Sequence, residues 1–210
     1  MMKQTEKRCY DGQEFRALAN DNEKYIEGHA AVFEQKTNIG GWFYEVIERG
    51  AFDETDFKDV ALFVNHNWES IPLARSRRNN GNSTMTLKVD DVGLAIRAKL
   101  DVERNSAAEN LYSAIERGDL GGMSFCFSVD AEEWRDLNSD MPTRRIKKIG
   151  QVFEVSACNY PAYEQTDIHA RDLNALESAK KALDNARSQS LDNDNELELY
   201  KLKCRILGGI

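Results

Sequence analysis

A serine hydroxyl, a histidine imidazole and a carboxylate in this sequence could together form an activated nucleophile. A neutral imidazole is the usual base for such a hydroxyl, and a carboxylate beside the imidazole can hold its tautomer. The chain has three histidines, His29, His66 and His169. Among them, His66 stands where an expected strand meets a polar loop, in Val64-Asn65-His66-Asn67-Trp68. A histidine at a strand end is more often a structural hydrogen-bonding residue, so its interpretation as a base depends on its partners.

Ser124 is the candidate nucleophile. In Gly121-Gly122-Met123-Ser124-Phe125-Cys126-Phe127, apolar side chains alternate with Ser124 and Cys126, as they do on a strand. A serine between two core-facing residues has a fixed backbone, which the positioning of a nucleophile requires. The simpler alternative is a serine on the solvent face of a strand. A further alternative makes Cys126 or Cys158 the nucleophile, with His66 as its base.

Glu154 is the candidate carboxylate. It lies in Gln151-Val152-Phe153-Glu154-Val155-Ser156, where the apolar neighbours predict burial. A buried carboxylate needs a partner, and orienting His66 would provide one. The alternative is a structural ion pair between Glu154 and Arg144 or Arg145.

The strands that must hold these residues are predicted by alternating apolar side chains. We expect them at 14–18, 25–33, 60–66, 84–89, 94–100, 123–129 and 146–158, the last broken at Gly150. The first two should pair antiparallel, and Asp91-Val92-Gly93 should turn a hairpin. One helix is expected from Ala107 to Arg117, with a capping box of Ser106 and Glu109 and a stop at Gly118. This pattern predicts an α+β, mainly β fold: a closed or nearly closed mixed β-barrel with external helices.

The composition changes after about Arg171, where alanine, leucine, lysine and aspartate become frequent. We therefore expect a catalytic domain over 1–170 and a helical C-terminal tail over 171–210 with a polar break near 188–195. A length of 210 residues with 41% hydrophobic content suits one globular domain and an appendage.

Charge and cysteine usage argue against several classes of partner. A net charge of −8 and a pI near 5.1 disfavour nucleic acid. The four cysteines form no CxxC pair, so neither a zinc ribbon nor a redox motif is expected, and we expect no metal or cofactor. No apolar run approaches the roughly 18 residues of a membrane span, and no leader is apparent, so we expect no membrane partner and a soluble cytoplasmic chain.

A series of short runs follows one another in order from about Gly28 to Thr166. The opening is carried by Gly28-His29-Ala30-Ala31-Val32-Phe33, by the run from Gly40 to Phe52, and by Asn65-His66-Asn67. It continues with Pro72-Leu73-Ala74-Arg75, Asp91-Val92-Gly93-Leu94, Arg117-Gly118-Asp119, Met123-Ser124-Phe125, Glu154-Val155-Ser156 and Tyr160-Pro161-Ala162-Tyr163. Together these runs resemble the tailed-phage prohead protease family, which is similar in fold to the herpesvirus maturational proteases.

The resemblance implies a serine endopeptidase with Ser124 as nucleophile and His66 as base. Glu154 is the implied third member, and His169 stays a rival because a second histidine takes that role in the herpesvirus enzymes. By the same analogy, backbone amides near Arg144 and Arg145 could form the oxyanion hole. Ala74 and Cys126 stand where the family often has glycine, which bears on the geometry of the substrate cleft.

The implied activity is the cleavage of phage capsid and scaffold proteins during prohead maturation, by Ser-His acyl transfer without a cofactor. The implied partners are the major capsid protein and scaffold segments, in the host cytoplasm inside the assembling prohead; self-association stays open. The tail over 171–210 could dock on these proteins or be removed by self-processing. A non-enzymatic alternative is an inactive, protease-like scaffold or assembly factor.

Overall fold

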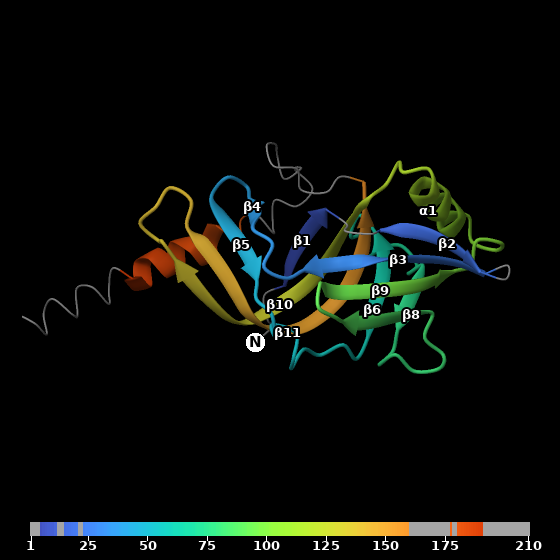
Figure 1. Ribbon diagram of the computed structural model, residues 1–210, viewed down its shortest axis with the longest axis horizontal. Helices are drawn as coiled ribbons and strands as arrows, with labels where there is room; N and C mark the ends of the chain where they lie inside the picture. Colours follow the sequence, from blue (N-terminus) through green and yellow to red (C-terminus); the bar gives the residue numbers. More distant parts are fainter. Residues whose placement is uncertain (1–4, 12–14, 21–22, 160–176, 178–179, 191–210) are drawn as a thin grey trace, which may run out of the picture.

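The computed structural model describes residues 5–11, 15–20, 23–159, 177 and 180–190 (Figure 1). These residues are mainly in strands, with one named helix, α1 (Ser106–Glu116). The strands are β1 (Glu6–Asp11), β2 (Arg16–Asn20), β3 (Glu23–Val32), β4 (Thr37–Ile39), β5 (Phe43–Ile47), β6 (Val60–Val64), β7 (Ala74–Ser76), β8 (Met85–Val89), β9 (Gly93–Leu100), β10 (Gly122–Arg135) and β11 (Thr143–Cys158). Within the described ranges, no helix has the length and apolar character needed to cross a membrane.

The strands form two sheets. The larger has the order β1-β10-β11-β5-β4, with β6 and β7 attached through β11, and the smaller has the order β2-β3-β9-β8. β11 pairs in parallel with β5 near its start and with β6 near its end. Its 16 residues are long enough for both partners, so the larger sheet branches at β11.

The prediction of a closed barrel is therefore wrong for the part of the chain described, because both sheets end in edge strands. The ladder between β10 and β11 contains register shifts between Cys126 and Phe127 and again around Val129 and Ala131. Such bulges bend a strand pair and increase its twist. The bent pair runs through the length of the larger sheet (Figure 1), and the strands at the two ends of its order, β1 and β4, are not paired with each other in the described residues.

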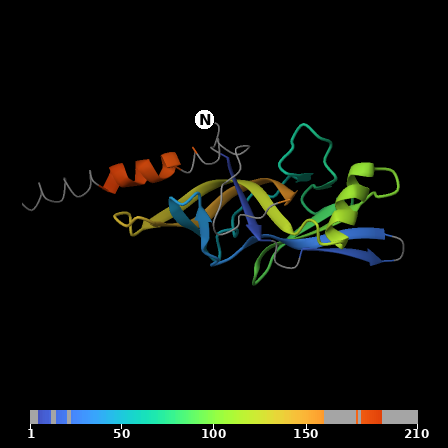
Figure 2. The same cartoon turned by 90° about the horizontal axis from the view of Figure 1, so that it is seen from above.

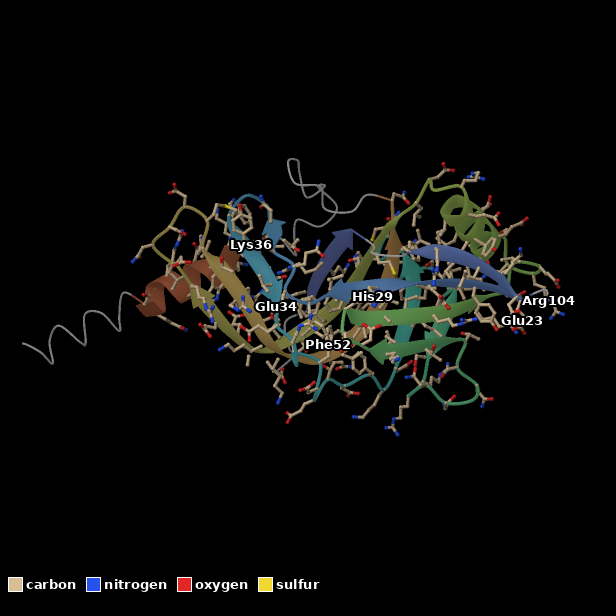
Figure 3. The ribbon with its side chains drawn as sticks, in the orientation of Figure 1. Glu23, His29, Glu34, Lys36, Phe52 and Arg104 are labelled. Carbon is tan, nitrogen blue, oxygen red and sulfur yellow. The ribbon has the colours of Figure 1, made fainter. Side chains whose placement is uncertain are left out.

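The hydrophobic core lies between the two sheets and joins them. Buried apolar side chains of β3 and β9 pack with those of β10 and β11 in one continuous cluster. The ring of Phe125, next to the candidate nucleophile, lies 4.3 Å from that of Phe127 and 6.1 Å from that of Phe52, which Figure 3 labels (centroid distances). Full burial of one such ring is worth about 1.5–3 kcal/mol, so these contacts anchor the strand that carries Ser124.

Several local expectations are confirmed. β2 and β3 are antiparallel, and β8 and β9 form the expected hairpin. Gly93 begins β9 at a close approach to β3, where an added Cβ would come within 1.9 Å of the Ala31 carbonyl oxygen. Gly150, in contrast, does not break β11. The register passes from Gln151 to Ile149 between successive residues of β10, so Gly150 lies in a bulge within a continuous strand.

The helix forms where expected, but its cap differs from the prediction. Asn105 is the N-cap, and its side chain accepts hydrogen bonds from the backbone N–H groups of Ala107 and Ala108. Ser106 is thus the first helical residue, and the predicted capping box with Glu109 is not used; Asn is as good a cap as Ser. The helix packs against β2, β3 and β9 of the smaller sheet (Figure 2).

Part of the predicted tail is described, and it is helical over 180–190. Leu183 is buried there against Ile39 and Phe43 of β4 and β5. The Arg187 guanidinium donates to the carbonyl oxygens of Leu137 and Ser139, at 3.3 and 3.4 Å. The other tail residues, apart from Glu177, lie outside the described residues, so the division at residue 170 stays a prediction.

Candidate active site

The side chains of Ser124, His66 and Glu154 form one line of hydrogen bonds. His66 Nε2 lies 2.6 Å from Ser124 Oγ, and His66 Nδ1 contacts Glu154 Oε1. Ser124 and Glu154 are buried, and the imidazole is 12% exposed. A hydroxyl, an imidazole and a carboxylate in this order are the arrangement in which the imidazole can remove the hydroxyl proton while the carboxylate holds the ring.

Ser124 is held by strands on both sides of β10. Its backbone lies opposite Cys9 of β1 and opposite Ser156 of β11. Met123 and Phe125 enter the core, as the alternation predicted. The alternative of a solvent-facing serine is wrong, because Ser124, Cys126 and Ser128 are all fully buried on the opposite side of the strand.

His66 reaches Ser124 because the chain turns sharply after β6. The strand ends at Val64, two residues before the expected end, and Asn65 and His66 follow with φ angles of 50° and 55°. This left-handed conformation is uncommon for residues other than glycine, although Asn and His tolerate it better than most. The Asn65 N–H donates to the Ala157 carbonyl at 2.9 Å, which fixes the turn against β11.

Ser156 joins the histidine loop to the carboxylate, and the sequence analysis did not assign it a role. Its hydroxyl donates to Glu154 Oε2 at 2.7 Å and accepts the backbone N–H of His66 at 3.1 Å. The two residues are two apart on β11, so their side chains share one face of the strand. That spacing in Glu154-Val155-Ser156 was the signal that could have identified it.

The alternative of a structural ion pair between Glu154 and Arg144 or Arg145 is wrong. Arg144 instead binds Glu6, Glu45 and Glu132, and Arg145 binds Glu34 and Glu48. The backbone of both arginines lies in β11 between β10 and β5.

The other candidate residues lie elsewhere or outside the described ranges. His29, labelled on β3 in Figure 3, has its Nε2 atom 3.1 Å from Asp90 Oδ2. His169 lies outside the described residues. Both ring nitrogens of His66 contact oxygen atoms, those of Ser124 and Glu154, which favours the serine over Cys126 and Cys158 as its partner. In the described ranges, no group of three or more His, Cys, Asp or Glu side chains could hold a metal ion.

A buried charge cluster lies beside this site, formed by Glu6 and Arg8 of β1 with Glu45 and Arg144. Arg8 Nε donates to Glu45 Oε1 at 2.6 Å, and Arg144 Nη1 donates to Glu45 Oε2 at 3.0 Å. Burial by itself would raise the pKa of Glu6, but the charges and hydrogen bonds of Arg8 and Arg144 lower it from 4.5 to about 2. Glu6 is therefore ionised at neutral pH, and its charge is paired with those of Arg8 and Arg144.

β1 also touches the candidate nucleophile directly. Ser124 Oγ donates a hydrogen bond to the carbonyl oxygen of Arg8 at 2.7 Å. The residues of β1 carry no strand pattern that was expected from the sequence, and no role was predicted for them.

Comparison with known proteins places the chain in a family. The family model described as caudovirus prohead serine protease matches residues 13–181. The chain belongs to this family, and it is a prohead protease that takes part in capsid maturation; the resemblance seen in the sequence is confirmed at this level. The prohead protease of Enterobacteria phage HK97 is 29% identical over 176 residues, which cover 81% of this chain and 71% of that protein.

A solved structure, that of the bacteriophage T4 capsid assembly protease, is also similar to this chain. It covers 75% of this chain and 99% of its own, with 13% sequence identity and a TM-score of 0.39.

Proposed function

We propose that this chain is a serine endopeptidase in which Ser124 is the nucleophile, His66 the general base and Glu154 the residue that orients His66. The observation that carries the proposal is the continuous contact from Ser124 Oγ through the imidazole to Glu154. An inactive, protease-like assembly factor would have no need of this alignment, so the enzymatic function is favoured over that alternative.

The proposed reaction is acyl transfer. His66 Nε2 removes the proton from Ser124 Oγ as the oxygen attacks a peptide carbonyl carbon. The imidazolium then gives this proton to the leaving amine, and the carbonyl side of the substrate stays bonded to Ser124. Water, activated by the same imidazole, attacks the ester, releases the acid and restores the hydroxyl. Glu154 stays a carboxylate throughout and stabilises the imidazolium.

The proposed substrates are the major capsid protein and scaffold segments of the same phage, cleaved inside the assembling prohead in the host cytoplasm. These substrates are proteins, and an endopeptidase cleaves peptide bonds within a protein chain. We also propose that residues 171–210 form a separate tail that docks on these proteins or is removed by self-processing. The described part of that tail contacts β4 and β5 through Leu183.

The test is co-expression of the chain with its capsid protein, followed by mass spectrometry of the assembled shells. Ser124→Ala should leave the capsid protein at full length. Ser128→Ala is the matched control, because Ser128 is also a fully buried serine on β10 and its Oγ lacks a hydrogen-bond partner. Capsid processing by the Ser124 variant at the rate of the control would refute the assignment of the nucleophile.

A further inference from the structure

The first strand lies along the edge of β10, the strand that carries the candidate nucleophile. β1 pairs antiparallel with the edge of β10 from Gly122 to Phe127, with Cys9 opposite Ser124. Figure 1 shows β1 running alongside β10 as the outer strand of the larger sheet. Extended peptides commonly bind proteins by adding a strand to a sheet edge in this way. β1 thus occupies the edge next to Ser124.

The contact between β1 and Ser124 resembles a bound substrate in one respect and differs from it in another. Ser124 Oγ lies 2.7 Å from the Arg8 carbonyl oxygen, so a peptide group of β1 is in direct contact with the hydroxyl. However, the hydroxyl donates to that oxygen. A hydroxyl has one proton, and both His66 Nε2 and the Arg8 carbonyl lie within hydrogen-bond distance of it. β1 therefore competes with the base for the proton.

Two side chains of β1 form ion pairs with charged residues of other strands. Glu6 and Arg8 are buried, whereas Lys7 between them points to the other face with its ammonium 5.8 Å from the Trp68 ring centre. Arg8 binds Glu45, and Glu6 binds Arg144 through both carboxylate oxygens, at 2.6 and 2.8 Å.

Glu45 and Arg144 belong to β5 and β11, so they stay in the protein if β1 leaves. The freed edge would then offer a carboxylate for a basic side chain and a guanidinium for an acidic one, two residues apart along the bound strand.

β1 also lies ahead of the range that the family model matches. That match begins at residue 13, whereas β1 ends at Asp11.

We propose that β1 is a substrate-like inhibitory strand, which fills the polypeptide-binding edge of β10 and must be displaced before a substrate binds there. A substrate takes the same antiparallel position, with a basic side chain at Glu45 and an acidic side chain, two residues earlier, at Arg144. The proposal rests on the proposed protease function and adds to it the class of peptide that the site accepts.

The test measures how fast a fluorophosphonate probe labels Ser124 in the full-length chain. Arg8→Glu brings a negative charge to Glu45 and should displace β1, so labelling should become at least tenfold faster. Arg135→Glu is the matched control, since it makes the same change of charge at an exposed position at the far end of β10, outside the pairing with β1. Its labelling rate should stay within about twofold of the unmodified chain.

A chain that begins at residue 12 is the second variant, and Ser124 in this chain should also be labelled at least tenfold faster than in the unmodified chain. Circular dichroism measures the folded fraction of each variant.

A synthetic peptide of residues 5–11 tests the substrate-like role directly. Added to the chain that begins at residue 12, it should slow labelling in proportion to its concentration. The same peptide with Arg8→Glu should have at least tenfold weaker effect. Equal labelling rates of the unmodified, Arg8→Glu and shortened chains would overturn the inhibitory role, as would equal acceleration by Arg8→Glu and Arg135→Glu. Equal protection by the two peptides would overturn the role of Glu45. If Ser124 is labelled in none of the chains, the protease function itself fails, and this inference fails with it.

Discussion

Replacement of Glu154 by glutamine tests the proposed mechanism most sharply, because the surroundings of the carboxylate dictate how the introduced amide must turn. One oxygen of Glu154 contacts His66 Nδ1, and the other accepts the Ser156 hydroxyl proton at 2.7 Å. Ser156 Oγ is already an acceptor for the His66 backbone N–H at 3.1 Å, so its own proton points toward Glu154. In Glu154→Gln the amide oxygen should stay on Ser156 and the NH₂ group should face the imidazole.

An NH₂ group facing Nδ1 forces the wrong tautomer on His66. The ring must then accept at Nδ1 and carry its proton on Nε2, where it can no longer receive the proton of Ser124. A carboxylate-to-amide change of this kind in a Ser-His-Asp triad lowers turnover by about 10⁴-fold. We expect a loss of about 10³- to 10⁴-fold here, or about 4–5 kcal/mol of transition-state stabilisation. The assay is the second-order rate constant for labelling of Ser124 by a fluorophosphonate, with the thermal unfolding midpoint as the control for folding.

A second substitution separates this tautomer effect from simple damage. Adding Ser156→Ala to Glu154→Gln removes the hydroxyl that holds the amide oxygen, so the amide can turn and accept from Nδ1–H. That hydrogen bond is worth about 1 kcal/mol, which predicts a recovery of about fivefold over the single Glu154 variant. Ser156→Ala alone should cost less than about tenfold, because Glu154 keeps its contact with the imidazole. The reasoning is refuted if folded Glu154→Gln labels within tenfold of the unmodified chain, or if the double variant is slower than the single one.

Three further outcomes are expected. His169→Ala should change the labelling rate of Ser124 less than about threefold, because Glu154 already occupies His66 Nδ1; a loss as large as that of the Glu154 variant would give His169 the third position. The pKa of Glu6 is lowered from 4.5 to about 2 because its partners Arg8 and Arg144 outweigh its burial. Its carboxylate therefore stabilises the fold fully above pH 4.5 and loses this effect as the pH falls toward 2. Urea unfolding should show the unmodified chain losing about 2 kcal/mol more than Glu6→Gln between pH 7 and pH 3. A chain ending at residue 170 should keep the labelling rate of Ser124 within about threefold but enter proheads poorly, as counted by protease copies per shell; normal incorporation would exclude a docking role for the tail.

Local sequence patterns determined much about this protein. Alternating side chains in Met123-Ser124-Phe125 and in the hairpin around Gly93 place strands and their core faces, because a side chain's direction on a strand depends only on its position. The helix ending before Gly118 follows from apolar spacing and the permissive backbone of glycine. The ordered motifs were specific enough to identify the family and to point to Ser124, His66 and Glu154 as candidates.

Other features were decided only by the tertiary structure. The burial of Ser124 and the contact between Glu154 and His66 depend on which strands lie next to each other. The parallel partners of β11, the strands β5 and β6, come from distant parts of the chain. Ser156 gains a role only because the turn at His66 places a backbone N–H within reach of its hydroxyl. The position of β1 on Ser124 is likewise invisible in the sequence, because the six residues of β1 find their partners more than a hundred residues away, on β10. Pairing at that distance depends on the edge that the folded sheet leaves open, and no local pattern encodes it.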